Sequence, residues 1–106
     1  MGMTNKNTLN EKIVCSDGFT MSVQASEYAY CQPRYTGAEQ YEEVEVGYPS
    51  QREELLMEYA ERPTEPTDTV YAYVPAALVY AVIVKHGGMV SGELPNGIPN
   101  CLPELL

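Results

Sequence analysis

The sequence predicts an α+β fold, in which a mostly antiparallel sheet of three or four strands carries two helices on one face. Three observations lead to this prediction: short segments in which apolar and polar residues alternate, an Asp-Gly turn between the first two of them, and a helix-capping signal after the third. The 106 residues suffice for one domain. We expect it to span residues 11–90, between a disordered segment at 1–10 and an extended, proline-rich arm at 91–106.

The first element is a predicted β-hairpin. Residues 13–15 and 19–25 flank Ser16-Asp17-Gly18. Asp-Gly favours a tight turn because glycine adopts positive φ without strain. In the second strand, every other side chain is apolar, and these share the predicted buried face: Phe19, Met21, Val23 and Ala25. Residues 26–40 lack periodicity and are predicted to form a long connection.

The third predicted strand places carboxylates on its solvent side. Val44, Val46 and Tyr48 should face one way, and Glu43 and Glu45 the other.

A helix is predicted at residues 50–62. Ser50 and Glu53 match the capping box, in which each side chain accepts a hydrogen bond from the other residue's free N–H. Three glutamates should lie within about 60° of one another, opposite the apolar side of the helix: Glu54, Glu58 and Glu61. Pro63 and Pro66 would then end the helix, because proline lacks the N–H donor.

Residues 69–74 predict a fourth strand, with Tyr71 and Tyr73 on its wet face. Its buried face should hold Val70, Ala72 and Val74. Pro75 suits the start of a second helix that ends at Gly87, although β-branched residues leave a strand as the alternative for 76–84. As a helix, this segment would be apolar all round, so we expect burial in a homodimer or higher homo-oligomer.

Proline recurs at every fourth position of the C-terminal residues, Pro95, Pro99 and Pro103. This spacing prevents a regular helix or a central strand, so an extended arm is expected. Apolar side chains of the arm should pack back over the domain, with docking into another chain as the alternative: Leu94, Ile98 and Leu102.

Charge excludes several classes of function. The net charge is −9, and ten of the fifteen acidic residues lie between Glu39 and Asp68. Nucleic acid and anionic membranes would repel such a chain, so we expect it to bind neither directly. The longest apolar run, 74–84, is about half of a membrane span, and no signal peptide opens the chain. A cytoplasmic location is expected.

No catalytic residue, metal site or cofactor is predicted. The three cysteines are widely separated, and His86 is the only histidine, which leaves too few clustered ligands for zinc. His86 lies beside Lys85 at a predicted helix end, where a cation has a structural role, and no nucleophile motif accompanies it.

The leading candidate site is the acidic surface. It could imitate nucleic-acid phosphates and occupy the basic groove of a protein that handles DNA or RNA. A solvated face that only keeps the protein soluble is the alternative. The residues predicted to bind the partner are Glu42, Glu43, Glu45, Glu54, Glu58, Glu61, Tyr71 and Tyr73.

A second candidate site consists of Tyr28, Tyr30 and Arg34. Aromatic rings can stack on a base and a guanidinium can bind phosphate, which would suit a nucleotide-like ligand. The alternative is that the rings cover the edge of the core while Arg34 pairs with a surface glutamate.

Three segments resemble small accessory proteins of bacteriophages: DGFTMSVQAS at 17–26, YCQPR at 30–34 and VEVGYPS at 44–50. Small acidic phage proteins often antagonise host defence, including CRISPR effectors, and the resemblance implies this kind of role without assigning any residue. The leading hypothesis is therefore a non-catalytic inhibitor of a basic, nucleic-acid-handling host defence protein. The alternatives are an oligomer that sequesters a nucleotide-like signal and a phage structural or assembly component.

Overall fold

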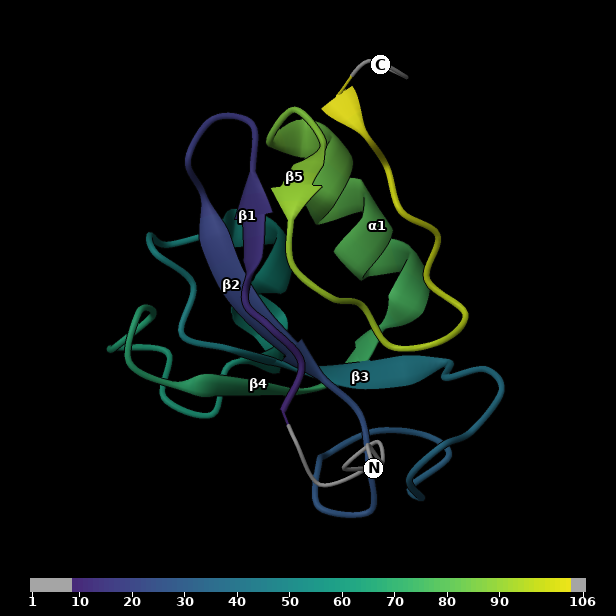
Figure 1. The fold of residues 1–106 in the computed structure, drawn as a ribbon. Coiled ribbons are helices and arrows are strands. Elements are labelled where there is room, and N and C mark those ends of the chain that lie inside the picture. The colour runs from purple at the N-terminus through teal and green to yellow at the C-terminus, as the bar shows by residue number, and fades with distance from the viewer. Residues whose placement is uncertain (1–8, 104–106) are drawn as a thin grey trace.

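The computed structural model describes residues 9–103, in which five strands, a 3₁₀ helix and an α-helix form an α+β fold (Figure 1). In chain order, the elements are β1 (Ile13–Cys15), β2 (Thr20–Gln24), β3 (Glu43–Gly47), η1 (Glu54–Tyr59), β4 (Val70–Pro75), α1 (Ala76–Lys85) and β5 (Met89–Ser91). The predicted α+β class and antiparallel pairing are confirmed, but the sheet has five strands instead of three or four. Of the segment predicted to be disordered, residues 1–8 lie outside the described part, and Asn10 is hydrogen-bonded to β2.

The strands pair antiparallel in the order β4-β3-β2-β1-β5. The first four follow one another as a meander, and β5 returns to pair with β1. In Figure 1, β3 and β4 lie across the direction of β1, β2 and β5, so the sheet bends strongly along β2. The bend leaves an inner face, which holds the core, and an outer face.

The hairpin predicted between β1 and β2 is confirmed. Gly18 adopts a φ of 94°, which glycine tolerates without strain. Cys15 N donates to Phe19 O at 2.8 Å, and Asp17 Oδ1 accepts a hydrogen bond from Phe19 N at 2.9 Å. The side chains predicted to face the core include three that are fully buried: Phe19, Met21 and Val23.

The two helices, η1 and α1, contact each other and contribute to one hydrophobic core on the inner face of the sheet. Leu56 of η1 packs there with three residues of α1: Val79, Val82 and Ile83. The segment at 76–84 is thus a helix, because burial of one side outweighs the weak helix propensity of its β-branched residues. The predicted end of this helix at Gly87 is confirmed, since Gly87 takes a φ of 89°.

The α-helix predicted at residues 50–62 is wrong, because only the short 3₁₀ helix η1 forms there. Ser50 is bound to β2 instead of capping a helix: its Oγ accepts from Thr20 N at 2.9 Å, and its N–H donates to Thr20 O at 2.8 Å. Glu53 takes the capping position alone and accepts a hydrogen bond from Leu55 N at 2.9 Å.

The faces predicted for β4 are right for Tyr73 and Val74 but wrong for Tyr71, because this strand contains a bulge. Val44 lies opposite Val74 but Val46 lies opposite Tyr71, so β4 has one residue more than β3 between the two pairs. Tyr71 therefore points into the core, where it is 0% exposed and its hydroxyl donates to a backbone carbonyl at 2.5 Å. Tyr73 remains exposed, with a left-handed φ of 55°. Two residues expected on the buried face are only half-buried: Val70 and Ala72.

Irregular segments cover both edges of the sheet. Met89 of β5 donates its N–H to Cys101 O at 2.7 Å, and Glu61 donates its N–H to Val70 O of β4 at 3.0 Å. Backbone groups at a sheet edge that already form such hydrogen bonds are not available to pair with a strand of another chain.

The C-terminal segment runs past α1 (yellow in Figure 1) and contributes Ile98 to the core. Leu94 packs against the core and is partly buried, whereas Leu102 is exposed. The prediction that these side chains pack back over the domain is therefore confirmed for Ile98 and Leu94 and wrong for Leu102.

Candidate functional site

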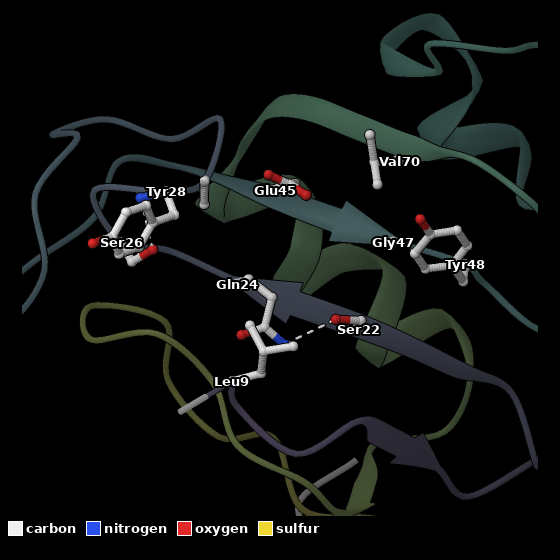
Figure 2. Close-up of a pocket in the computed structure, with 10 residues that line it drawn as sticks. Leu9, Ser22, Gln24, Ser26, Tyr28, Glu45, Gly47, Tyr48 and Val70 are labelled. Atoms are coloured by element: carbon white, nitrogen blue, oxygen red, sulfur yellow. Dashed lines mark hydrogen bonds between the residues drawn. The ribbon is translucent and has the colours of Figure 1, made fainter. Parts of the chain in front are cut away.

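The outer face of the sheet carries a cavity of about 180 Å³. We call it the outer-face cavity, and Figure 2 shows it between Tyr28 at one end and Tyr48 at the other. Its floor and sides include polar residues of β2 and β3, which are half-exposed because alternate side chains of a strand point away from the core: Ser22, Gln24 and Glu45.

Gly47 forms part of the floor of this cavity, in the last position of β3. Its φ lies outside the left-handed region, and a Cβ added here would meet Ser22 Cβ and Val70 Cγ1 at 3.7 Å, an ordinary contact. Neither the backbone nor the packing thus requires glycine. Glycine inside a strand destabilises it by roughly 0.5–1 kcal/mol and often marks a place where a ligand approaches closely. In this protein, Gly47 leaves the floor of the cavity without a side chain at this position.

Tyr28 and Tyr48 are unusually accessible for large rings, with 73% and 52% of their surface exposed. Tyr48 also adopts a left-handed φ of 50°, which strains a residue with a Cβ by on the order of 1 kcal/mol. The prediction that Tyr48 shares the buried face of the third strand is therefore wrong. Such strain is often retained where a side chain serves a binding role.

The connection between β2 and β3 is tied to the outer face through Tyr30. Glu45 Oε1 accepts a hydrogen bond from Tyr30 N at 2.9 Å, and Tyr73 N in the β4 bulge donates to Tyr30 O at 3.1 Å. The rings of Tyr30 and Tyr73 are 6.0 Å apart, and the Arg34 guanidinium lies 5.3 Å from the centre of the Tyr30 ring. We call Tyr28, Tyr30, Tyr48, Tyr73 and Glu45 the tyrosine face.

The connection is ordered by its own contacts. Tyr41 is buried, donates its hydroxyl to Tyr35 O at 2.7 Å and accepts from Ala38 N at 3.1 Å. The C-terminal segment braces this connection, since Asn96 Nδ2 donates to Ala38 O at 2.9 Å. A platform fixed in this way loses little conformational entropy when it binds a partner.

The glutamates predicted to form one acidic surface lie in two separate places. Glu43 and Glu45 point to the outer face from β3, and Glu42 is exposed just before this strand. Glu54 and Glu58 belong to η1, on the inner side. At three residues per turn, Glu54 and Glu58 are about 120° apart, so the predicted stripe is wrong.

Two further residues of the predicted partner-binding set, Glu61 and Tyr71, belong to neither of these two groups of glutamates. Glu61 is exposed and lies beside β4, to which its backbone is bonded. Tyr71 is buried and unavailable to a partner, so it leaves the candidate set.

A second cluster, which the sequence analysis missed, surrounds His86. This side chain is only 5% exposed and stacks on Phe19, with ring centres 4.0 Å apart. Its Nδ1 lies 2.7 Å from Asp17 Oδ2, and its Nε2 lies 2.6 Å from Glu53 Oε1. Burial alone would lower the pKa of His86, but the hydrogen bonds that its ring donates to the carboxylates of Glu53 and Asp17 outweigh this effect and raise the pKa.

Glu53 is the buried centre of this cluster, with 1% of its surface exposed. Its Oε2 accepts from Lys85 Nζ at 2.8 Å and from Leu55 N at 2.9 Å. Burial opposes ionisation, but these two bonds and the one to His86 outweigh it, so the pKa of Glu53 is lowered. Both ring nitrogens of His86 are occupied, which leaves no lone pair for general-base catalysis. We interpret the cluster as a structural ion network.

Other chemical groups are similarly enclosed. All three cysteines are buried and form no disulfide, and burial together with the nearby Asp17 charge raises the pKa of Cys15 to about 11. A thiol with such a pKa is a poor nucleophile at neutral pH.

Within residues 9–103, no group of three or more His, Cys, Asp or Glu side chains is placed to hold a metal. No helix in the described part of the chain is long and apolar enough to cross a bilayer.

Comparison of the chain with protein-family models, with curated proteins and with solved structures finds no significant match.

Proposed function

We propose that the protein is a non-catalytic binding protein that docks its tyrosine face onto a basic surface of a partner protein. One observation carries the proposal: four exposed tyrosines and Glu45 lie on the outer side of the sheet, opposite the side that η1 and α1 cover. Tyrosine is enriched at the energetic centres of protein interfaces, because its ring buries a large area and its hydroxyl can still form a hydrogen bond.

The charge of the chain favours a cationic partner. With a net charge of −9, the protein attracts basic surfaces over a distance of about one Debye length and repels acidic ones. Glu43 and Glu45 place part of this charge on the outer face, where the tyrosine face lies. The expected association is fast and sensitive to salt.

The resemblance to phage accessory proteins extends the proposal to a biological role. In that role the protein acts in the cytoplasm of a bacterial host and inhibits a basic defence protein that handles nucleic acid. Inhibition would follow from occupation of the basic surface. The tyrosine face replaces the acidic helix as the main contact, because the regular array of carboxylates that would imitate phosphates does not form on η1.

The alternative of a nucleotide-binding protein has less support. The guanidinium of Arg34 lies over the ring of Tyr30, and the carboxylate of Glu45 is directly bonded to the backbone of Tyr30. An anionic phosphate bound between these residues would face that carboxylate at close range, which is unfavourable.

We also propose that the outward side of α1 mediates self-association. Four exposed residues without charge follow the i, i+3, i+4, i+7 spacing of one helix side: Ala77, Tyr80, Ala81 and Val84.

The binding proposal is tested by capture from a bacterial lysate that contains defence systems. The bait is wild-type protein, a variant with Tyr28→Ala and Glu45→Gln, or a control with Tyr35→Ala and Glu58→Gln. Each variant removes one exposed tyrosine and one charge. Wild type and control should retain a basic protein at low salt and release it at high salt, and the first variant should not retain it. Equal retention by all three baits would contradict the proposal.

A further inference from the structure

The outer-face cavity has the size of a site for one amino-acid side chain. Its volume of about 180 Å³ is smaller than the roughly 300–1,000 Å³ that is usual for pockets that bind drug-sized molecules. Tyr28, Tyr48 and Glu45 of the tyrosine face line the cavity, so a partner docked on these residues would cover its opening. A single side chain of that partner is the occupant of matching size.

The walls of the cavity suit an aliphatic stem. Tyr28 and Tyr48 close its two ends, and Leu9 and Val70 add apolar surface (Figure 2). The Leu9 wall is fixed in place, because the adjacent Asn10 N donates to Gln24 Oε1 at 2.8 Å and Gln24 Nε2 donates to Asn10 O at 3.0 Å. The amide of Gln24 is thus engaged within the protein.

Glu45 supplies the charge that decides which side chain fits. Its Oε1 accepts the bond from Tyr30 N, while its Oε2 has no hydrogen-bond partner and the carboxylate has no ion-pair partner among residues 9–103. A single ammonium can bind the unpartnered Oε2 alone, whereas the two-pronged guanidinium of arginine would have to share Oε1 with Tyr30 N.

We propose that the outer-face cavity binds one lysine side chain of the basic partner, with the ammonium on Glu45 and the methylene stem between Tyr28 and Tyr48. The inference rests on the proposed function, because the partner supplies the lysine. Lysine combines a charged head with an apolar stem, and the cavity offers a surface to each. Gly47 adds no side chain to the floor on which the stem would lie.

The probe is the tripeptide acetyl-Gly-Lys-Gly-amide, titrated to millimolar concentration against ¹⁵N-labelled protein and followed by NMR. Two matched peptides replace lysine with norleucine, which lacks the ammonium, or with arginine. The lysine peptide should shift the amide signals of Gln24, Glu45 and Tyr48 in a saturable manner, and norleucine should not. Equal shifts with norleucine, shifts spread over all exposed acidic residues, or no shifts at the cavity would each overturn the inference. Tighter binding of the arginine peptide would overturn the choice of lysine.

Variants of the protein distinguish binding in the cavity from general attraction of the peptide to the negative charge of the chain. Glu45→Gln should weaken binding of the lysine peptide about tenfold or more, and Glu58→Gln should leave it unchanged. Gly47→Val should fill the floor and abolish binding, while Gly47→Ala tests whether the position tolerates a side chain without unfolding. If the protein captures a basic partner but Glu45→Gln and Gly47→Val do not affect that capture, the proposed function stands and the lysine site falls.

Discussion

His86 shows how a single residue can hold distant parts of the chain together. Its ring joins the β1–β2 turn, through Asp17, to the start of η1, through Glu53, and lies directly after α1. With a carboxylate on each nitrogen, the imidazole donates both N–H groups only when it is protonated. The network therefore stabilises the fold in one range of pH.

The first prediction concerns the pH dependence of stability. The pKa of His86 is raised above 6.5 in the folded protein, so its contribution is complete below pH 6.5 and is lost as the pH rises through the folded value. The pKa values of Glu53 and Asp17 are lowered from 4.5 and 3.8, so their contribution is complete above pH 4.5 and is lost as the pH falls.

The free energy of unfolding, measured with urea at a series of pH values, should thus be highest between pH 4.5 and pH 6.5. His86→Gln should flatten the alkaline side of the curve. A wild-type stability that increases above pH 6.5 would contradict the assigned network.

The second prediction concerns Glu53. Glu53→Gln removes the buried charge that faces His86 and Lys85, and breaking a buried ion network in this way costs about 3–5 kcal/mol of stability. Glu58→Gln on the same 3₁₀ helix is exposed and should change stability by less than about 0.5 kcal/mol. Urea unfolding at the pH of maximum stability measures both values, and equal effects of the two substitutions would refute a structural role for Glu53.

At the scale of elements, predictions from patterns within one segment were correct. Features that depend on contacts between distant segments were not predicted. The hairpin, the third strand and the end of α1 follow from local signals: Asp-Gly, alternation, and glycine after a helix. The prediction of a helix at 50–62 was wrong because Glu53 is held by Lys85 and His86, which lie 32 and 33 residues further along the chain. The predicted outward position of Tyr71 on β4 was wrong because alternation does not reveal a bulge.

The candidate site was predictable only in part. Tyr28, Tyr30 and Arg34 were named because they lie close together in one segment, and Tyr73 because it alternates onto the wet face of a predicted strand. The structure places the Tyr30 ring beside both Tyr73 and Arg34. Two of its central features, Gly47 and the strained Tyr48, were missed, because a glycine in a strand carries no signal about the space above it. The Glu45–Tyr30 bond spans fifteen residues and depends on the path of the long connection.

The third prediction concerns α1. Ala81 is exposed in the middle of the uncharged side of this helix, so Ala81→Glu should abolish self-association by placing a charge in the contact. Gln51→Glu adds the same charge at another exposed position and should have no effect. Light scattering after size-exclusion chromatography gives the mass of each. A monomeric wild type, or a dimer in both variants, would contradict self-association through α1.

For the whole molecule, the fold separates two exposed surfaces. The tyrosine face lies on the outer side of the sheet, whereas α1 covers the inner side, and irregular segments cover both sheet edges. A dimer formed through α1 would leave both tyrosine faces accessible. Two such faces could bind one partner with two basic surfaces more tightly than either alone.

The most direct test of the account is the affinity of the purified protein for the basic partner that it captures, measured by calorimetry at low and at high salt. We predict that Tyr28→Ala with Glu45→Gln weakens binding at least about tenfold at low salt, that the control with Tyr35→Ala and Glu58→Gln binds like the wild type, and that salt weakens every complex. The account would be contradicted if the control substitutions weakened binding and the substitutions in the tyrosine face did not.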